Sequence, residues 1–281
     1  MISAENNSAT LEAITNKLIN AKTTDGTKIL LSEDQICKIK TIKTNLCSGD
    51  LHALHHSADD FEMVVSIINE HTSCQLSALF LLRLMVLSQS TSSIETSVIN
   101  PLLAKLNSGL TAFSGVPSSV MAFCTLSNLL CNSKTREAIF TNRLDSQITD
   151  CTMSYLLHPR KELRQICATL IYNLTLICTP SKEPNGGWSP PPYRAAATDH
   201  LPELAVQILC SVLEGIPNES DSSIRKRRLA TSCRIFRAST SPSRDLVNDL
   251  GFSSYFDELL NAHDTSVDEK NILHEISNYL L

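Results

Sequence analysis

Apolar residues recur along most of this chain at steps of three and four, which places them on one side of a helix. The clearest example is the stretch 161–178, where an apolar stripe runs from Leu163 to Ile177. Within that stretch, Asn173 stands among leucine and isoleucine residues. A buried amide needs hydrogen-bond partners, so we expect Asn173 to have a specific partner.

The same arrangement repeats along the chain. Asn128 lies 45 residues before Asn173, and Arg83 lies 45 residues before Asn128. Downstream the pattern resumes at Arg234, and Asn278 follows 44 residues later. A lone polar residue in an apolar helix at this period is typical of armadillo or HEAT repeats. We therefore expect an all-α, armadillo/HEAT-like right-handed α-solenoid of about five to six repeats.

Local signals mark where helices begin and end. Ser32, Ser57 and Ser266 each precede an acidic or amide residue by three positions, the capping-box pattern. Gly251 is expected to take a left-handed conformation between two helices. No segment alternates with period two for long enough to predict a strand. The predicted helices cover residues 10–21, 32–46, 57–68, 75–88, 93–106, 117–130, 135–140, 146–157, 161–178, 243–250 and 252–261, and a last helix follows residue 266.

The domain organisation predicted from this pattern is simple. Residues 1–9 are interpreted as a short disordered start, and residues 10–281 as a single armadillo-like domain. The composition changes at 180–193, a Pro/Gly-rich stretch that contains the only tryptophan, Trp188. We interpret it as an insertion loop, because helical periodicity resumes after it. The alternative is a polyproline ligand presented by residues 190–193.

Composition and charge exclude several classes of protein. The net charge of −5 argues against general nucleic-acid binding. No apolar run reaches membrane length, and residues 1–15 lack a signal peptide. The ten cysteines include no CxxC pair, and most lie in apolar periodic runs, where a thiol is a small hydrophobic group. We predict a reduced, cytoplasmic protein, with a nuclear location as the alternative.

Catalytic and metal sites find little support in the sequence. His158 and His200 could partner a cysteine nucleophile, but no recognisable setting surrounds any cysteine. His52, His55 and His56 have helical spacing, yet no carboxylate or thiol companion is evident nearby. We predict that the protein is not an enzyme and holds no cofactor and no metal.

A cationic segment is a stronger candidate for a functional site. Residues 225–237 contain six arginines and lysines in an acidic protein. Arg227 and Arg234 share a helix face, whereas Arg228 lies about 100° away, beside the inner face. Guanidinium groups on one face suit carboxylates through bidentate pairing. The alternatives are a solvated face, salt bridges to neighbouring acidic residues, or a nuclear-localisation signal at 225–228.

Asn128 and Asn173 have side chains that can form hydrogen bonds with the main chain of a peptide. The carbonyl and amide of one asparagine side chain match the main-chain groups of an extended peptide. Asn128 and Asn173 could therefore hold a peptide along a groove. Each could instead cap a helix end or pair across the helix layer.

The order of these motifs resembles the PUL domain, a family found at the C-terminus of the phospholipase-activating protein and in some thioredoxin-containing or desumoylase-like proteins. The resemblance covers nearly the full chain. It is carried by the segments 31–34 (LSED), 78–84 (ALFLLRL), 125–128 (TLSN), 168–173 (ATLIYN), 228–229 (RL) and 246–252, and by the terminal helix.

This resemblance implies an armadillo-like arch whose basic concave groove binds the acidic C-terminal tail of the valosin-containing AAA ATPase, the ubiquitin-dependent segregase. It implies a monomeric, non-catalytic adaptor with no nucleic-acid, membrane or small-molecule partner. Arg228 matches a groove arginine of the family, and Cys124 stands where the family has another. Arg234 is the expected replacement. The predicted peptide-binding residues are Arg228, Arg234, Asn128, Asn173, Arg227, Tyr172 and Cys124.

Two other interpretations remain open from the residues. One is a structural spacer whose repeating pattern reflects packing alone. The other is the C-terminal interaction module of a longer thioredoxin- or desumoylase-like protein, with a different peptide partner.

Overall fold

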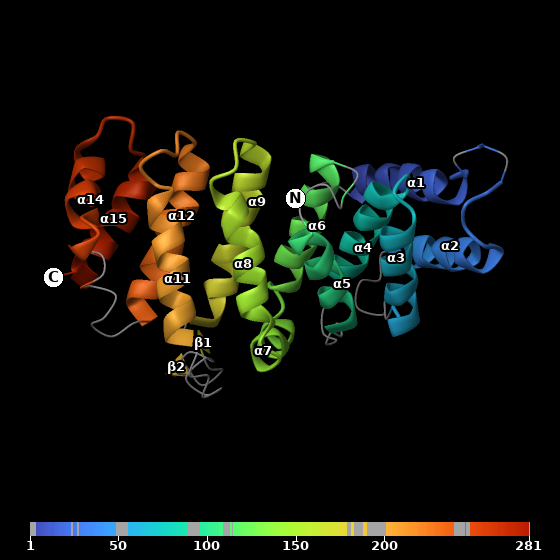
Figure 1. Ribbon diagram of the computed structural model, residues 1–281, viewed down its shortest axis with the longest axis horizontal. Coiled ribbons are helices and arrows are strands. Elements are labelled where there is room, and N and C mark those ends of the chain that lie inside the picture. The colour runs from blue at the N-terminus through green and yellow to red at the C-terminus, as the bar shows by residue number, and fades with distance from the viewer. Residues whose placement is uncertain are drawn as a thin grey trace. The chain divides into compact units, whose positions relative to one another are not determined.

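The computed structural model divides the chain into two compact units, Met1–Ala138 and Ile139–Leu281, which are described in turn (Figure 1). Thirteen α-helices are present in the described part of the chain. The structure describes residues 4–23, 25–26, 28–48, 56–88, 96–108, 113, 115–178, 181–182, 188–189, 201–238, 245 and 248–280.

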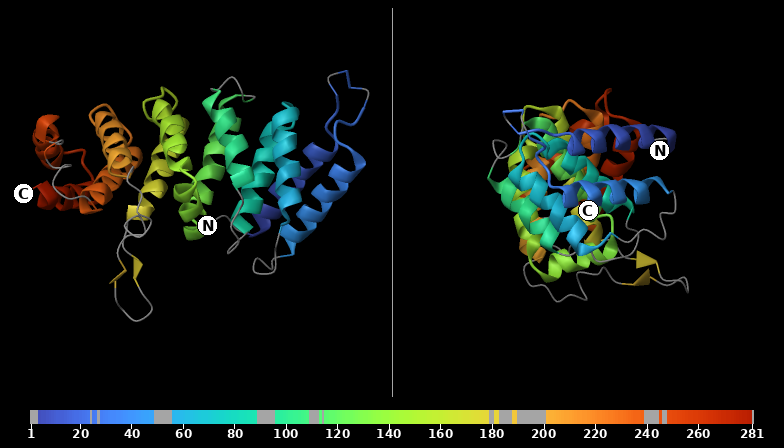
Figure 2. Two further views of the ribbon diagram at one scale, coloured as in Figure 1. Left: turned by 60° about the horizontal axis from the view of Figure 1, so that its bottom comes forward. Right: turned by 90° about the vertical axis from the view of Figure 1, so that its right-hand side faces the viewer.

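The N-terminal unit is built around one central helix, α4. This helix packs against α1, α3 and α6, while α5 lies beside α3 (Figure 2). Because α4 is covered on several sides, it is apolar nearly all round, with Leu79 and Leu82 fully buried. The bounds are α1 Ala4–Ile19, α2 Glu33–Cys47, α3 Ala58–Glu70, α4 Gln75–Ser88, α5 Thr96–Asn107 and α6 Val116–Leu129.

The capping boxes predicted at the start of α2 and α3 are confirmed. The Ser32 N–H donates to Gln35 Oε1 at 2.9 Å, and the Gln35 N–H donates to Ser32 Oγ at 3.2 Å. Ser57 and Asp60 exchange the same two bonds at 3.0 and 3.2 Å. Each box satisfies N–H groups that a helix start leaves without partners.

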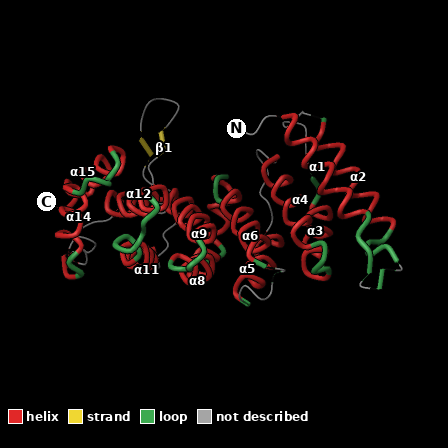
Figure 3. Tube along the Cα trace, turned by 90° about the horizontal axis from the view of Figure 1, so that it is seen from above, coloured by secondary structure: helices red, strands yellow, loops and turns green. Residues whose placement is uncertain are grey.

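The C-terminal unit consists of two helix layers. Helices α9, α12 and α15 follow one another in one layer, and α8, α11 and α14 form the other (Figure 3). Helix α7 (Ser133–Thr141) spans the division between the units. The remaining bounds are α8 Leu144–Leu156, α9 Lys161–Leu174, η2 Thr175–Cys178, α11 Leu201–Glu214, α12 Ser222–Ala238, α14 Phe252–Asn261 and α15 Val267–Leu280.

The turns of this unit also follow the local signals. Gly251 has φ 72°, the left-handed conformation predicted for it. The start of α15 is a capping box, because Ser266 donates through its N–H and hydroxyl to Glu269 Oε2 at 2.9 and 2.6 Å. The Glu269 N–H in turn donates to Ser266 Oγ at 3.3 Å.

The structure differs from the predicted elements in a few places. Helix α1 begins at Ala4, so residues 4–9 of the expected disordered start form its first turns. The helix expected over 161–178 ends at Leu174 and continues as the 3-10 turn η2. Of the loop 180–193, only Ser181–Lys182 and Trp188–Ser189 are described, and they pair as two-residue antiparallel strands. Half of the predicted helix 243–250, residues 243–244 and 246–247, lies outside the described residues. None of the described helices is long and apolar enough to cross a membrane.

Candidate peptide-binding surface

Two arginines of α12 lie against α9 in the C-terminal unit. Arg227 donates a hydrogen bond to the Thr169 hydroxyl. Arg234 donates to the Tyr172 carbonyl at 3.0 Å and to the Tyr172 hydroxyl. The Arg234 guanidinium lies 3.7 Å from the centre of the Tyr172 ring, a cation–π contact. We call Thr169, Tyr172, Arg227 and Arg234 the α9–α12 surface.

The α9–α12 surface is partly open to solvent. Arg227, Arg234 and Tyr172 are all half-buried, so each keeps part of its side chain accessible to a ligand. Asn173 is different, because only 9 % of it is exposed. This burial fits the alternative in which Asn173 pairs across the helix layer.

The other cations of α12 are neutralised by carboxylates. Arg225 Nε is 2.7 Å from Glu269 Oε1, in a pair that is buried on both sides. Lys226 pairs with Asp268, and Arg237 pairs with Glu275. Salt bridges, one of the alternatives for the cationic segment, therefore account for these three residues. Arg227 has no carboxylate within ion-pair distance in the described part of the chain.

Arg228 does not line a surface, so the prediction that it is a groove arginine is wrong. Its side chain is only 1 % exposed. One Nη group donates to the Leu156 carbonyl, and the same group lies 3.6 Å from Glu219 Oε2. The guanidinium also lies against Gly215, where a Cβ would be 1.3 Å from Arg228 Nη1. Burial lowers the pKa of Arg228, and the charge of Glu219 opposes this effect.

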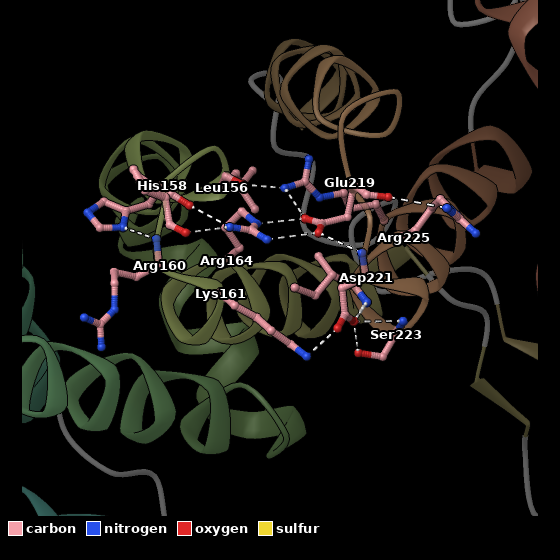
Figure 4. A network of polar contacts seen from close by, with 12 residues as sticks. Leu156, His158, Arg160, Lys161, Arg164, Glu219, Asp221, Ser223 and Arg225 are labelled. Atoms are coloured by element: carbon pink, nitrogen blue, oxygen red, sulfur yellow. Dashed lines mark hydrogen bonds and ion pairs between the residues drawn. The ribbon is translucent and has the colours of Figure 1, made fainter. Parts of the chain in front are cut away.

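Glu219 is the centre of the polar network that holds Arg228 (Figure 4). Arg164 binds the Glu219 carboxylate with two hydrogen bonds of 2.9 and 3.2 Å. The same arginine donates to the carbonyls of His158 and Pro159 at 3.0 Å each. The network therefore joins the α8–α9 turn to the turn between α11 and α12. Sequence reasoning missed it, because its members lie far apart in the chain.

Asp221 extends this network to the start of α12. Its Oδ1 accepts hydrogen bonds from the N–H groups of Ser223 and Ile224 at 3.0 and 3.1 Å. Its Oδ2 lies 2.5 Å from Lys161 Nζ on α9. The bond from Lys161 and the bonds of the helix start lower the pKa of Asp221 well below its usual range. This helix start was not among the predicted elements, although an aspartate before a helix is a recognisable cap.

The remaining predicted residues lie in the N-terminal unit. Cys124 and Asn128 are one turn apart on α6, and both are half-buried. Burial raises the pKa of the Cys124 thiol, and the charge of Arg83 on α4 opposes that shift. The predicted site thus divides into two groups of residues, one in each unit.

The PUL domain family matches this chain over residues 3–269, nearly its whole length. The chain belongs to the PUL family. No curated protein matches it closely enough to count as a relative. Two engineered proteins of known structure are similar to this PUL domain, with 12% and 15% identity and TM-scores of 0.59 and 0.60. The similarity covers 96% of this chain, and 96% and 98% of theirs.

A designed armadillo repeat protein in complex with the peptide (KR)4 is also similar to this PUL domain. It is 8% identical, has a TM-score of 0.59, and the similarity covers 96% of this chain and 99% of that one. These structures place the chain in the all-α, armadillo-like solenoid class. PUL membership and a helical-repeat fold indicate a protein-binding adaptor module.

Proposed function

We propose that this PUL domain is a non-catalytic adaptor that binds the acidic C-terminal tail of the valosin-containing AAA ATPase. The α9–α12 surface is the proposed contact in the C-terminal unit. The observation that carries the proposal is the contrast within α12. Arg225, Lys226 and Arg237 are neutralised by carboxylates of the chain, whereas among the described residues Arg227 is held only by the neutral hydroxyl of Thr169.

The geometry of Arg234 supports the same proposal. Stacking on the Tyr172 ring and two hydrogen bonds to Tyr172 hold this guanidinium in one orientation before any ligand arrives. A preorganised side chain loses little conformational entropy on binding, so more of the interaction energy appears as affinity. Arg227 lies two helical turns away, and an extended acidic tail offers carboxylates at several positions along its length.

Arg228 contributes indirectly in this proposal. Its bonds to Leu156 and Glu219 anchor α12 against α8 and the preceding turn. The anchored helix keeps Arg227 and Arg234 in place against α9. Arg228 is therefore a positioning residue. A substitution of Arg228 reports on the packing of α12 and not on direct contact with the ligand.

Binding of a fluorescein-labelled ATPase tail peptide, measured by fluorescence anisotropy, tests the proposal. A charge-assisted bond contributes about 1.5–3 kcal/mol, so Arg227→Gln combined with Arg234→Gln should weaken binding by at least about tenfold. Lys226→Gln is the control, because it removes one positive charge from the same helix at a residue already paired with Asp268. Higher salt should weaken wild-type binding.

Two results would refute this function. One is a wild-type domain that does not bind the tail peptide at low salt. The other is a double variant that binds as tightly as Lys226→Gln while its melting temperature matches that of the wild type. A tail peptide with amides in place of its carboxylates should bind weakly in every case, because the proposed contacts need negative charge.

A further inference from the structure

Glu269 is a fully buried carboxylate in the first turn of α15. Its Oε1 accepts a hydrogen bond of 2.7 Å from Arg225 Nε on α12, and Arg225 is buried as well. Its Oε2 accepts bonds from two hydroxyl groups, Ser222 of α12 at 2.9 Å and Ser266 at 2.6 Å. Glu269 therefore connects α15 to α12 through a buried ion pair and through hydroxyl donors.

The charge of Glu269 depends on these donors. Burial raises the pKa of Glu269, but the bonds from Arg225, Ser266 and Ser222 outweigh burial and hold that pKa below its ordinary value. The carboxylate is therefore ionised at neutral pH. A buried charge is costly unless it is paired and hydrogen-bonded, so a lost donor or an added negative charge beside Glu269 should weaken the contact between the two helices.

Ser266 is an accessible member of this group. It is exposed at the end of the turn between α14 and α15, and the next residue, Val267, is 75 % exposed. Acidic residues surround it in the sequence. Asp264 lies two positions before Ser266, and Asp268 and Glu269 lie two and three positions after it. A kinase with a basic substrate groove can recognise carboxylates at these positions.

We propose that Ser266 is a phosphorylation site for a serine kinase that recognises acidic residues around its target. In this reaction Ser266 Oγ attacks the γ-phosphorus of ATP, the bond between that phosphorus and the β–γ bridging oxygen breaks, and ADP leaves with the bonding electrons. The hydroxyl proton passes to a base of the kinase. The product carries a phosphate of charge about −1.5 to −2 at pH 7 beside the Glu269 carboxylate.

Phosphorylation should open the contact between α15 and α12. It removes the hydroxyl hydrogen that bonds to Glu269 and places a second anion at the same position. A helix N-terminus attracts negative charge, but this attraction is smaller than the repulsion between two anions at hydrogen-bond distance in a buried site. Arg225 cannot neutralise both anions, because it already binds Glu269 and lies 3.5 Å from Asp264 Oδ2. The first turns of α15 should therefore separate from α12.

Ser57 offers a matched comparison in the N-terminal unit. It is exposed, it begins α3 with the same kind of capping box, and Asp59 and Asp60 follow it at the same two positions. The difference lies in the acidic partner. Asp60 is half-buried, so its charge stays partly hydrated, whereas Glu269 is fully buried. A negative charge at Ser57 should therefore have little effect on α3.

The first experiment treats the folded full chain with casein kinase 2, which recognises acidic residues after a serine, and with Mg-ATP. Tandem mass spectrometry should place phosphate on Ser266, and Ser266→Ala should lose it. Thr265 should stay unmodified, because it is only 7 % exposed and its hydroxyl donates to the Leu259 carbonyl at 2.7 Å. A synthetic peptide of residues 260–272 confirms that the enzyme is active. A full chain without phosphate on Ser266 would overturn the site.

The second experiment separates the effect of charge from the loss of the cap. Asp and Asn are equally good N-caps, so Ser266→Asp and Ser266→Asn differ mainly in charge. In native-state hydrogen exchange, amides 269–273 should exchange at least about tenfold faster in Ser266→Asp than in Ser266→Asn. Ser57→Asp and Ser57→Asn should exchange alike at the start of α3.

Equal or slower exchange in Ser266→Asp than in Ser266→Asn would refute the proposed effect, because the attraction of the helix N-terminus would then outweigh the repulsion from Glu269. The phosphorylated wild-type chain should show the same faster exchange of amides 269–273, and unchanged exchange would also refute it. These measurements use no tail peptide, so failure of the ATPase tail to bind would refute the proposed function alone.

Discussion

Among the described glycines, Gly215 is the position where one added methyl group should cause the largest disturbance. A Cβ at Gly215 would lie 1.3 Å from Arg228 Nη1 and 2.5 Å from its Cζ, so the guanidinium has to move. An exposed arginine would move at little cost. Arg228 is 1 % exposed and bonded to Leu156 and Glu219, so any movement breaks buried polar contacts.

The expected cost of Gly215→Ala follows from those contacts. Breaking a buried ion pair typically costs about 3–5 kcal/mol, because it leaves an uncompensated charge. Glu219 keeps its two bonds from Arg164, so only the arginine loses its partner. We therefore expect Gly215→Ala to lower the free energy of unfolding by about 3 kcal/mol, the lower end of that range.

Urea denaturation followed by circular dichroism measures this change. Gly251→Ala is the control in the same unit, because Gly251 has φ 72° and a Cβ there would meet nothing within 4 Å. That variant should cost only about 1–2 kcal/mol, the strain of a left-handed alanine. A double-mutant cycle with Arg228→Ala isolates the clash, because the cost of Gly215→Ala should largely disappear once the guanidinium is gone.

A Gly215→Ala variant as stable as wild type would refute the clash with Arg228. Simple additivity of the costs of Gly215→Ala and Arg228→Ala would also refute it, since additivity would mean that the two positions do not meet. A cost equal to that of Gly251→Ala in both backgrounds would point to backbone conformation as the cause.

Two further predictions concern titratable groups. Burial lowers the pKa of His56, and the charge of Asp60 opposes this shift. As the pH falls, His56 is therefore protonated in the unfolded chain before it is protonated in the folded chain. The stability from neutral His56 is present above about pH 6.5 and is lost as the pH falls through the folded-state pKa; thermal melts should show a steeper loss of stability for wild type than for His56→Gln. Burial raises the pKa values of Cys151 and Cys233 to about 12. A thiol reagent at pH 8 should modify exposed Cys37 quickly and these two only on unfolding; equal rates would contradict their burial.

Much of the architecture could be predicted from local signals. A capping box needs only a serine and a partner three residues later, so the helix starts at Ser32, Ser57 and Ser266 were readable directly. Residues 75–88 were predicted as a helix, and the nearly all-round apolar character of that segment agrees with the packing of α4 against α1, α3 and α6. The left-handed Gly251 followed from its place between two helices.

The candidate site could be predicted only in part. The seven-residue spacing placed Arg227 and Arg234 on one side of α12, and both contact α9. Helical spacing could not show that Arg225, Lys226 and Arg237 meet carboxylates, because these partners lie on another helix.

The sequence by itself determined the helix starts at the capping boxes and the apolar faces of the helices, because these depend on residues within a few positions of each other. The repeat of about 45 residues could also be recognised, because it is a periodicity of the sequence itself. Tertiary structure alone decided whether each charged side chain is exposed, paired or buried. Arg228 was expected in a groove, but it is buried against Leu156, which is 72 positions away, and Gly215 leaves room for it. Whether a guanidinium meets solvent, a carboxylate or a glycine depends on the packing of distant helices, which determines both desolvation and available partners.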